Sequence, residues 1–214
     1  LMSKEIKVSL VGNPNTGKTS IFNSLTGLNQ KIGNYPGVTV DKKEGIYYSQ
    51  NRTKVKILDL PGIYSLNATS ADEHIVVKLL TDSENKDFPD LAVIVSDIEN
   101  LKRNLFLFTQ VKDLKIPCLL VINMIDVMEK KGVSLNIPVL EKKLNTKIAL
   151  VSTRKNIGVV ELKQLIENYK DFPKKKTIDI NSIDSTYFKN LKKLYPGEET
   201  YKLWLLINQI KFFN

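Results

Sequence analysis

The chain has 214 residues and a net charge of +9, with 42% hydrophobic and 26% charged residues. This composition excludes a disordered chain and suits one globular domain with an appendage. The single cysteine, Cys118, excludes a disulfide within the chain and suits the cytosol. No window approaches the ~20 consecutive apolar residues of a membrane span, so we expect this part of the protein to be soluble.

The positive charge alone does not identify a nucleic-acid-binding protein. The lysines are spread along the chain, and the densest run is only Lys174-Lys175-Lys176, which reads better as a linker or a solvated face. An anionic membrane surface or a polyanionic ligand would also be attracted by such a diffuse field. Nucleic acid is therefore an unfavoured partner.

Apolar runs alternate with helical patterns along most of the chain, which predicts an α/β fold with a mostly parallel sheet. We expect six strands, at residues 4–11, 42–49, 54–59, 91–96, 117–123 and 147–151, and helices at 18–26, 70–81, 100–114, 136–144 and 159–169. The connection 50–53 is too short for a crossover. Strand 42–49 should therefore be the one antiparallel edge strand.

The first strand and first helix are joined by the complete phosphate-binding pattern Gly12-Asn13-Pro14-Asn15-Thr16-Gly17-Lys18-Thr19, with Ser20 following. Glycines let the backbone wrap a polyphosphate, the helix N-terminus attracts it, and Lys18 reaches its β- and γ-phosphates. Thr19 offers a hydroxyl to Mg²⁺. The alternative is a glycine turn with a chance lysine, which the strand–loop–helix setting disfavours.

Two further segments complete a predicted Mg²⁺ and γ-phosphate site. Asp59 ends strand 54–59, where open α/β sheets bind ligands, and can hold Mg²⁺ through water, while the amide of Gly62 can reach a γ-phosphate. The loop Gly33-Asn34-Tyr35-Pro36-Gly37-Val38-Thr39 carries a threonine placed to complete the Mg²⁺ shell when a γ-phosphate is present. An ordinary turn and an ordinary Gly/Pro loop are the alternatives.

The base should be recognised after strand 117–123. The carboxylate of Asp126 can accept from both N1–H and N2–H₂ of guanine, which argues for GTP, while Asn123 braces the loop and Met124 covers the base without charge. Backbone amides of Ser152-Thr153-Arg154 fit a loop that touches guanine O6. The alternative for Asn123 and Asp126 is a pair of loop caps.

After residue 170 a linker leads to two amphipathic helical patterns, split at Pro196-Gly197. We therefore expect a G domain over residues 1–170 and, over 171–214, the linker and first helices of an incomplete helical domain. Large apolar residues crowd the last eleven positions with little to cover them: Trp204, Leu205, Leu206, Ile207, Ile210, Phe212 and Phe213. These residues predict that the chain is a fragment whose continuation supplies the rest of the helical domain.

These motifs together resemble the G domain of the FeoB family of bacterial ferrous iron transporters, over about residues 4 to 170. The resemblance lies in the phosphate loop, in residues 33–45, in Asp59-Leu60-Pro61-Gly62-Ile63-Tyr64-Ser65-Leu66, in Asn123-Met124-Ile125-Asp126 and in Val151-Ser152-Thr153-Arg154. Tyr35 departs from the family, which often carries tryptophan there. The resemblance implies a Ras-like P-loop GTPase fold, and the tail looks like the start of the family's helical regulatory domain. The resemblance also implies membrane spans in the continuation of the chain.

The resemblance also implies how hydrolysis is helped. Ile63 stands where many GTPases carry a water-positioning glutamine, and an isoleucine can neither orient nor deprotonate water. In the family, the residue matching Asn15 helps to coordinate K⁺ together with backbone carbonyls of the Gly33 to Thr39 segment, here Gly33 and Asn34. We therefore expect Mg²⁺ and K⁺ as cofactors, a slow intrinsic rate, and Asn15, Lys18, Thr39 and Gly62 as catalytic residues.

The resulting prediction is a GTPase forming the cytosolic part of an inner-membrane iron transporter, with the transporter's membrane domain and a homo-oligomer as candidate partners. Two alternatives remain open: a soluble GTPase acting on ribosome or tRNA, and a nucleotide switch without useful hydrolysis. The predicted nucleotide contacts are Gly12, Asn13, Pro14, Asn15, Thr16, Gly17, Lys18, Thr19, Ser20, Gly37, Val38, Thr39, Asp59, Gly62, Asn123, Met124, Asp126, Ser152, Thr153 and Arg154.

Overall fold

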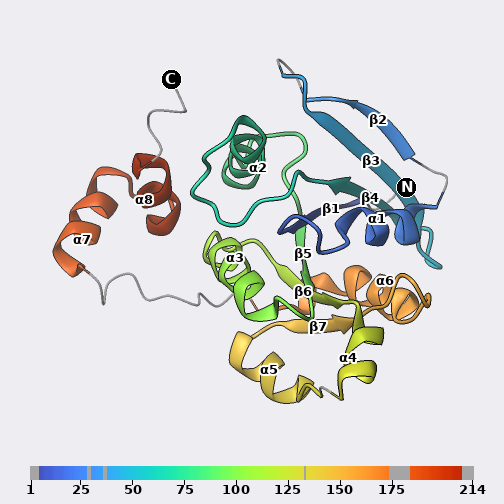
Figure 1. The fold of residues 1–214 in the computed structure, drawn as a ribbon. Coiled ribbons are helices and arrows are strands. Elements are labelled where there is room, and N and C mark those ends of the chain that lie inside the picture. Colours follow the sequence, from blue (N-terminus) through green and yellow to red (C-terminus); the bar gives the residue numbers. More distant parts are fainter. Residues whose placement is uncertain (1–4, 28–29, 36–37, 133, 174–183, 209–214) are drawn as a thin grey trace.

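The structure is a computed structural model that describes residues 5–27, 30–35, 38–132, 134–173 and 184–208. One seven-stranded sheet runs through it in the order β2-β3-β4-β1-β5-β6-β7 (Figure 1). The strands are β1 (Glu5–Gly12), β2 (Gln30–Asn34), β3 (Asp41–Tyr48), β4 (Lys54–Asp59), β5 (Leu91–Asp97), β6 (Cys118–Asn123) and β7 (Lys147–Leu150). The predicted α/β fold with a mostly parallel sheet is confirmed.

The expectation of six strands with one antiparallel edge strand is wrong. β4, β1, β5, β6 and β7 are parallel, but β3 pairs antiparallel with β4, and a further strand, β2, pairs antiparallel with β3 and forms the edge. β2 escapes a pattern search because its residues are half-exposed or exposed, so no apolar alternation marks it. Its pairing with β3 defines it instead.

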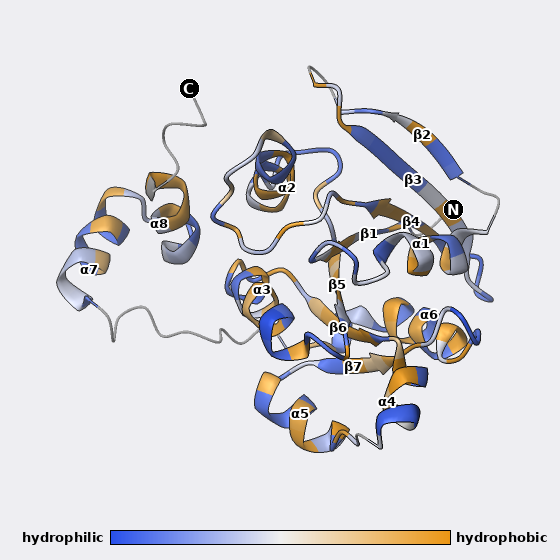
Figure 2. Ribbon diagram, in the orientation of Figure 1, coloured by the Kyte–Doolittle hydropathy of each residue, from blue (hydrophilic) through white to orange (hydrophobic). Residues whose placement is uncertain are grey.

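Helices cover both faces of the sheet. They are α1 (Lys18–Thr26), α2 (Ala71–Thr81), α3 (Leu101–Asp113), α4 (Ile125–Lys131), α5 (Ile137–Leu144) and α6 (Val159–Glu167), followed by the 3₁₀ turn η1 (Tyr169–Asp171). One apolar cluster joins α1 and α6 to one face, and another joins α2, α3 and α5 to the opposite face. The central strands are correspondingly apolar, whereas β2 and β3 are largely hydrophilic (Figure 2).

The helix termini follow local rules. Ser70 caps α2 by accepting from the amide of Glu73, and the Glu73 carboxylate accepts in return from the amide of Thr69. Asn136 caps α5, and Asn145 ends it in a left-handed conformation. The five helices predicted within the G domain are present, whereas α4 was missed.

Two further helices follow, α7 (Ser185–Leu194) and α8 (Thr200–Asn208), as the two amphipathic patterns predicted. The expectation that this end of the chain lies uncovered is wrong for α8, because Leu205 is fully buried and Trp204 is half-buried. Leu203 and Tyr201 are buried with it, in the same apolar cluster as α2 and α3. Ile207 is exposed, while Ile210, Phe212 and Phe213 lie outside the described residues.

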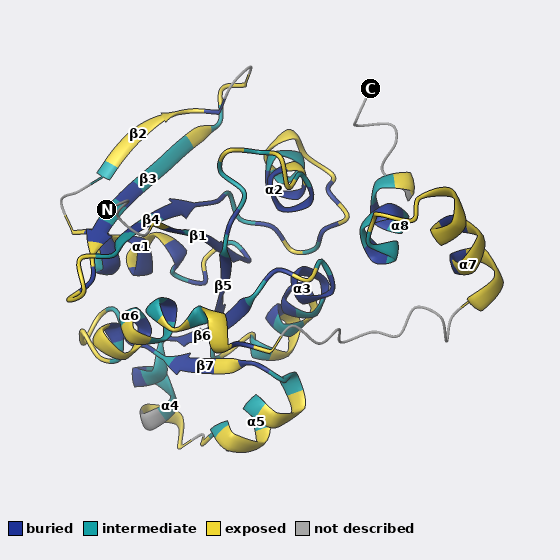
Figure 3. Cartoon of the chain, turned by 180° about the vertical axis from the view of Figure 1, so that it is seen from behind, coloured by how far each residue is buried: buried dark blue, intermediate teal, exposed yellow. Residues whose placement is uncertain are grey.

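Seen from behind the molecule, the central strands are buried, whereas the peripheral elements β2 and most of α7 are exposed (Figure 3). No helix among the described residues is both long and apolar enough to cross a membrane.

Candidate functional site

The loop between β1 and α1 lies at the carboxyl edge of the parallel strands, and two glycines shape it. A Cβ on Gly12 would lie 2.4 Å from the carbonyl oxygen of Val95, so the loop can pass over β5 only without a side chain there. Gly17 has φ 86°, and a Cβ on it would lie 2.3 Å from Nδ2 of Asn123. Both glycines are therefore required by close backbone approach.

Lys18 lies inside this loop and is 8% exposed. Its Nζ donates to the carbonyl oxygen of Asn13 at 3.3 Å, and the hydroxyl of Thr16 donates to the same oxygen at 2.9 Å. Burial lowers the pKa of Lys18, although the nearby Asp59 carboxylate opposes this. A desolvated ammonium group at the N-terminus of a helix is a strong site for a polyphosphate, because the anion replaces the lost hydration.

Asp59 ends β4 beside Thr19, whose hydroxyl donates to Oδ2 of Asp59 at 2.9 Å. The other carboxylate oxygen, Oδ1, is buried and has no hydrogen-bond partner among the described residues. Burial raises the pKa of Asp59, opposed by the Thr19 hydrogen bond and by Lys18. A hydroxyl and an unpaired carboxylate oxygen in contact are ligands of the kind Mg²⁺ prefers, so the residues fit that ion.

The segment after Asp59 is folded against the phosphate loop. A Cβ on Gly62 would lie 3.0 Å from Pro14, and the amide of Ile63 donates to the carbonyl oxygen of Gly12 at 3.1 Å. The Ile63 side chain is fully buried in the core. Ile63 is therefore a packing residue in this conformation, directed away from solvent water.

Asn123 ends β6 and braces the phosphate loop, as the sequence predicted: its Nδ2 donates to the carbonyl oxygen of Thr16 at 3.1 Å. Met124 follows with φ 63°, and its Cε lies near Gly17. The strand ends at Asn123 as the sequence predicted, but the helix α4, which the sequence did not predict, begins at Ile125. Asp126 is thus presented from the first turn of a helix.

Asp126 is held by the loop that follows β7. Its Oδ1 accepts from the hydroxyl of Ser152 at 2.7 Å, and this hydrogen bond holds the pKa of Asp126 below its usual value. Ser152 is buried and also accepts from the amide of Lys155, while its backbone pairs with Ile157. Thr153 is half-buried and Arg154 exposed. The carboxylate of Asp126 is therefore fixed and ionised, as an acceptor for two N–H donors must be.

The segment of residues 33–39 differs from its prediction. Gly33 and Asn34 lie in β2, paired with Lys42 and Asp41, instead of in the irregular loop that the sequence predicted. Their strand pairing explains the difference, since the hairpin extends as far as Tyr35, whose amide donates to the carbonyl oxygen of Val40. Val38 is exposed, while Pro36 and Gly37 lie outside the described residues.

The residues predicted to complete the Mg²⁺ shell and the K⁺ site are therefore apart in this conformation. Thr39 is exposed, and no hydrogen bond joins it to Thr19 or Asp59 in the part of the chain that the structure describes. Asn15 is exposed at φ 65° in the phosphate loop, whereas Gly33 and Asn34 belong to an edge strand. Ser20 is exposed in the first turn of α1. The residues proposed for K⁺ do not form one site in this conformation.

Sequence reasoning missed Gln110, a buried polar residue that contacts the segment after Gly62. It is 5% exposed in α3, and its Oε1 accepts from the amide of Leu66 at 2.9 Å. The available signal was a polar residue between apolar positions on the buried face of a helix. Its partner lies 44 residues away, so no local pattern could supply it.

Comparison with known proteins identifies the family to which the chain belongs. A family model described as ferrous iron transport protein B matches residues 6–166. The Fe(2+) transporter FeoB of Leptospira biflexa is 38% identical over 211 residues, which cover 98% of this chain and 29% of that protein. The Fe(2+) transporter FeoB of Escherichia coli K12 is 42% identical over 172 residues, covering 78% of this chain and 22% of that protein.

A solved structure of the cytosolic domain of the T. maritima FeoB iron transporter, in a GDP form, matches with a TM-score of 0.82 at 32% identity, covering 92% of this chain and 78% of that one. The chain spans less than a third of the length of the curated relatives described above. The phosphate loop, the Thr19–Asp59 pair and the Asp126 loop all fall within the matched region. The chain therefore belongs to the ferrous iron transport protein B family and contains its N-terminal G domain.

Proposed function

We propose that the chain binds GTP and GDP with Mg²⁺ and hydrolyses GTP to GDP and phosphate, as the regulatory G domain of a ferrous iron transporter. The observation that carries this proposal is the pair of buried groups Lys18 and Asp59 beside the Thr19 hydroxyl, because the Lys18 ammonium is desolvated and Oδ1 of Asp59 has no hydrogen-bond partner among the described residues. A phosphate–Mg²⁺ complex supplies both missing partners. The T. maritima relative was solved in a GDP form, which supports the choice of ligand.

Guanine specificity is assigned to Asp126. Its carboxylate keeps Oδ2 for the base while Oδ1 is held by Ser152, and the low pKa keeps it ionised. An adenine ring would meet this acceptor without the two donors of guanine, so the carboxylate would lose the hydrogen bonds that guanine supplies. The contacts proposed for Thr153 and Arg154 are backbone contacts to guanine O6 from the same loop.

The chain's own residues stabilise charge in the reaction, and none of them removes a proton from water. Lys18 and the amide of Gly62 are assigned to the γ-phosphate, while Ile63 is buried and cannot position the nucleophile. Bound Mg²⁺, held by Thr19 and Asp59 and later by Thr39, would neutralise phosphate oxygens. A slow intrinsic rate follows, because a general base and an arginine finger are both missing from the proposed set.

Stimulation by K⁺ is proposed from the family resemblance and from Asn15. The residues proposed for K⁺ are apart, so no chemical step is derived through the ion here. Gly33 and Asn34 would have to leave their pairing with β3 before their carbonyl groups could approach Asn15. The proposal thus requires a rearrangement of the edge of the sheet when GTP binds.

Phosphate release from GTP and from ATP, each measured with and without Mg²⁺ in KCl and in NaCl, tests the proposal. We expect release from GTP only, loss of activity without Mg²⁺, and faster release in KCl. Asp126→Asn is the matched variant: it should weaken GTP binding and shift preference towards xanthosine triphosphate. Equal binding of ATP and GTP by the parent chain would contradict the assignment of the base site.

The proposed cellular setting is the cytoplasmic face of the bacterial inner membrane, with the transporter's membrane-spanning part as partner. The Leptospira biflexa and Escherichia coli relatives are both Fe(2+) transporters and are much longer than this chain. Residues 1–170 are proposed as the G domain and 171–214 as the start of a helical regulatory domain. The family match leaves no observation in favour of a ribosome- or tRNA-associated GTPase.

A further inference from the structure

The helix α7 has one buried side and one exposed side. Phe188 and Leu191 are three residues apart on the helix, and both are buried in the apolar cluster that also contains residues of α8. All other residues of α7 are exposed. Because α8 lies between α7 and the sheet, the exposed side of α7 forms the periphery of the molecule (Figure 1).

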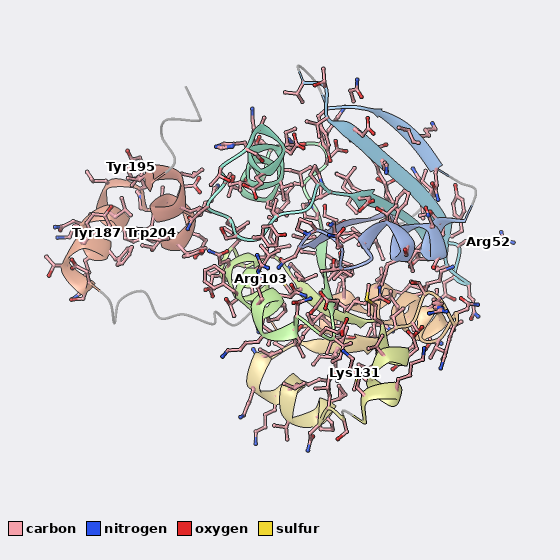
Figure 4. The ribbon with its side chains drawn as sticks, viewed as in Figure 1. Arg52, Arg103, Lys131, Tyr187, Tyr195 and Trp204 are labelled. Carbon is pink, nitrogen blue, oxygen red and sulfur yellow. The ribbon has the colours of Figure 1, made fainter. Side chains whose placement is uncertain are left out.

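Large apolar side chains gather on this periphery. Tyr187 and Leu194 are seven residues apart, which places them on the same side of the helix, and Leu194 is 73% exposed. Tyr195, directly after the helix, is exposed as well. Figure 4 shows both tyrosines at this end of the molecule. Three large apolar side chains within nine residues are thus left facing solvent.

Two lysines lie beside these apolar residues. Lys189 and Lys193 are four residues apart, so they are neighbours on the surface of α7, and both are exposed. Neither forms an ion pair with any residue that the structure describes. Together with Thr186, Asn190 and Lys192 they line a shallow hollow of about 340 Å³.

The carboxylates nearest to this surface in the sequence are engaged elsewhere. Asp184 caps the N-terminus of α7. Glu198 forms an ion pair with Lys202, and Glu199 forms one with Lys115. The exposed side of α7 therefore combines uncompensated positive charge with exposed aromatic and aliphatic groups.

We propose that the outer face of α7, formed by Tyr187, Lys189, Lys193, Leu194 and Tyr195, binds the surface of an anionic lipid bilayer. The lysine ammonium groups attract anionic headgroups. Tyrosine favours the headgroup level because its ring is apolar and its hydroxyl is polar, and leucine enters the acyl boundary below. The inference rests on the proposed setting of this chain at a membrane.

The mixture of side chains favours a bilayer over an acidic segment of another protein. An acidic segment would pair with Lys189 and Lys193 but would leave Leu194 without an apolar partner. A bilayer receives both kinds of group at once, because anionic headgroups and acyl chains meet at its surface. A peripheral helix can also approach a flat surface without obstruction from the sheet (Figure 1).

The first test removes the charge of the outer face. The double variant Lys189→Gln/Lys193→Gln is compared with Lys142→Gln/Lys143→Gln, which removes two exposed lysines from the last turn of α5 and so changes the net charge equally. Co-sedimentation of each chain, without nucleotide, is measured with vesicles of phosphatidylethanolamine and phosphatidylglycerol and with vesicles of phosphatidylcholine alone.

We expect the parent chain to bind the phosphatidylglycerol vesicles and to bind phosphatidylcholine much more weakly. The α7 double variant should lose about 20-fold in vesicle affinity, and the α5 double variant less than about twofold. Equal losses in the two double variants would mean that only the diffuse net charge of the chain is attracted. That result would overturn the assignment to α7.

The second test removes the apolar contribution. Leu194→Gln should weaken binding to the phosphatidylglycerol vesicles about fivefold. Val160→Gln is the matched control, because Val160 lies on α6 and is 72% exposed, and it should leave binding unchanged. Unchanged binding in Leu194→Gln, with a polyglutamate peptide bound as tightly as the vesicles, would indicate an acidic protein segment and overturn the bilayer.

The fold of the helical pair is checked in every variant by the fluorescence of Trp204, the only tryptophan of the chain. Its ring stacks on Tyr201 within α8, with the centroids 5.9 Å apart, so an unchanged emission spectrum reports an intact pair. Because vesicle binding is measured without nucleotide, it is independent of the GTPase proposal. A chain that bound GTP but no vesicles would overturn this inference alone, whereas one that bound vesicles but no guanine nucleotide would overturn only the proposed function.

Discussion

The phosphate loop and the β2–β3 hairpin contribute to the same proposed site, yet only the phosphate loop is already arranged to bind. Lys18, Asp59 and Asn123 are buried at the carboxyl ends of β1, β4 and β6. Thr19 donates to Asp59, and Asn123 donates to Thr16 of the loop. Thr39 is exposed, and Gly33 and Asn34 are paired within β2. The proposed nucleotide site is thus preorganised in the phosphate loop, while Thr39, Gly33 and Asn34 would have to be recruited to it.

The difference follows from what holds each region. The phosphate loop is fixed by close backbone contacts that only glycine allows. The hairpin is fixed by strand pairing at an exposed edge and by Tyr35, which is 7% exposed and lies under the ammonium of Lys42, 5.9 Å from its ring centroid. Edge pairing with one neighbour is easier to break than a buried loop, so a γ-phosphate can move the hairpin and leave the loop in place.

Gly17→Ala should have the largest effect, because it breaks the preorganised region directly. A left-handed alanine costs about 1–2 kcal/mol, and its Cβ would also displace the Asn123 brace, so GDP affinity should fall about 100-fold. Gly27→Ala is the matched control, since Gly27 has φ 59° but nothing within 4 Å of an added Cβ. Calorimetric titration with GDP measures both, and similar GDP affinities for the two variants would contradict the close-approach argument.

Asn15→Ala should separate nucleotide affinity, which we assign to the phosphate loop, from KCl stimulation, which we propose requires the hairpin as well. We expect GDP affinity within a few fold of the parent, because Asn15 is exposed in the loop, and a loss of most KCl stimulation, worth about 2 kcal/mol or 30-fold in rate. Phosphate release in KCl and NaCl provides the measurement. Equal stimulation in variant and parent would mean that Asn15 does not act in the recruited half.

Asp59→Asn should stabilise the folded protein at neutral pH, although it removes a residue proposed to hold Mg²⁺. Burial raises the pKa of Asp59 above the ordinary value of 3.8, so the charged form destabilises the free protein. Stability is therefore greatest when Asp59 is protonated and declines as pH rises through its folded pKa. The variant, which carries no charge, should be about 1 kcal/mol more stable near pH 7 and no more stable near about pH 4.

Denaturant unfolding of the parent and of Asp59→Asn across this pH range measures the difference in the free energy of unfolding. The variant should also lose Mg²⁺-dependent GTP binding. A stability difference that grows towards acid pH would have the wrong sign for a desolvated carboxylate. Such a result would mean that the Thr19 hydrogen bond and Lys18 outweigh the burial of Asp59.

Ile63→Val should have the smallest effect on rate. The side chain is fully buried, so the loss of one methylene should cost about 0.5–1.5 kcal/mol of stability. Hydrolysis should stay within about threefold, since no proton-transfer group is lost, against the 10² typical of such a loss. Single-turnover hydrolysis by protein that remains folded is the measurement, and a hundredfold decrease would reveal a positioning role for Ile63.

Most of the preorganised region could be predicted from sequence, because it is built from local rules. The motif from Gly12 to Thr19 lies between a strand and a helix with long apolar patterns, and Asp59 and Asn123 each end such a strand. α4 was missed although Asp126 in its first turn and Lys130 and Lys131 in its last turn match a helix dipole. Its short length and the absence of a strong apolar face concealed it.

The recruited region could not be predicted in this detail. Gln30–Asn34 has no apolar alternation, so β2 is defined only by its partner strand. The coverage of Leu205 and the contact between Gln110 and Leu66 depend on tertiary packing between distant segments. A sequence pattern shows which residues carry chemistry, but it does not show which conformation of a hairpin they occupy.

Hydrogen exchange of the amides in β2, compared among the free protein, its GDP complex and its Mg²⁺ complex with a non-hydrolysable GTP analogue, tests the central claim most directly. GDP should protect residues of the phosphate loop and leave Gln30–Asn34 as in the free protein, whereas the GTP analogue should change exchange across Gln30–Asn34. A hairpin that responds equally to GDP and to the analogue, or to neither, would contradict the division into a preorganised and a recruited half.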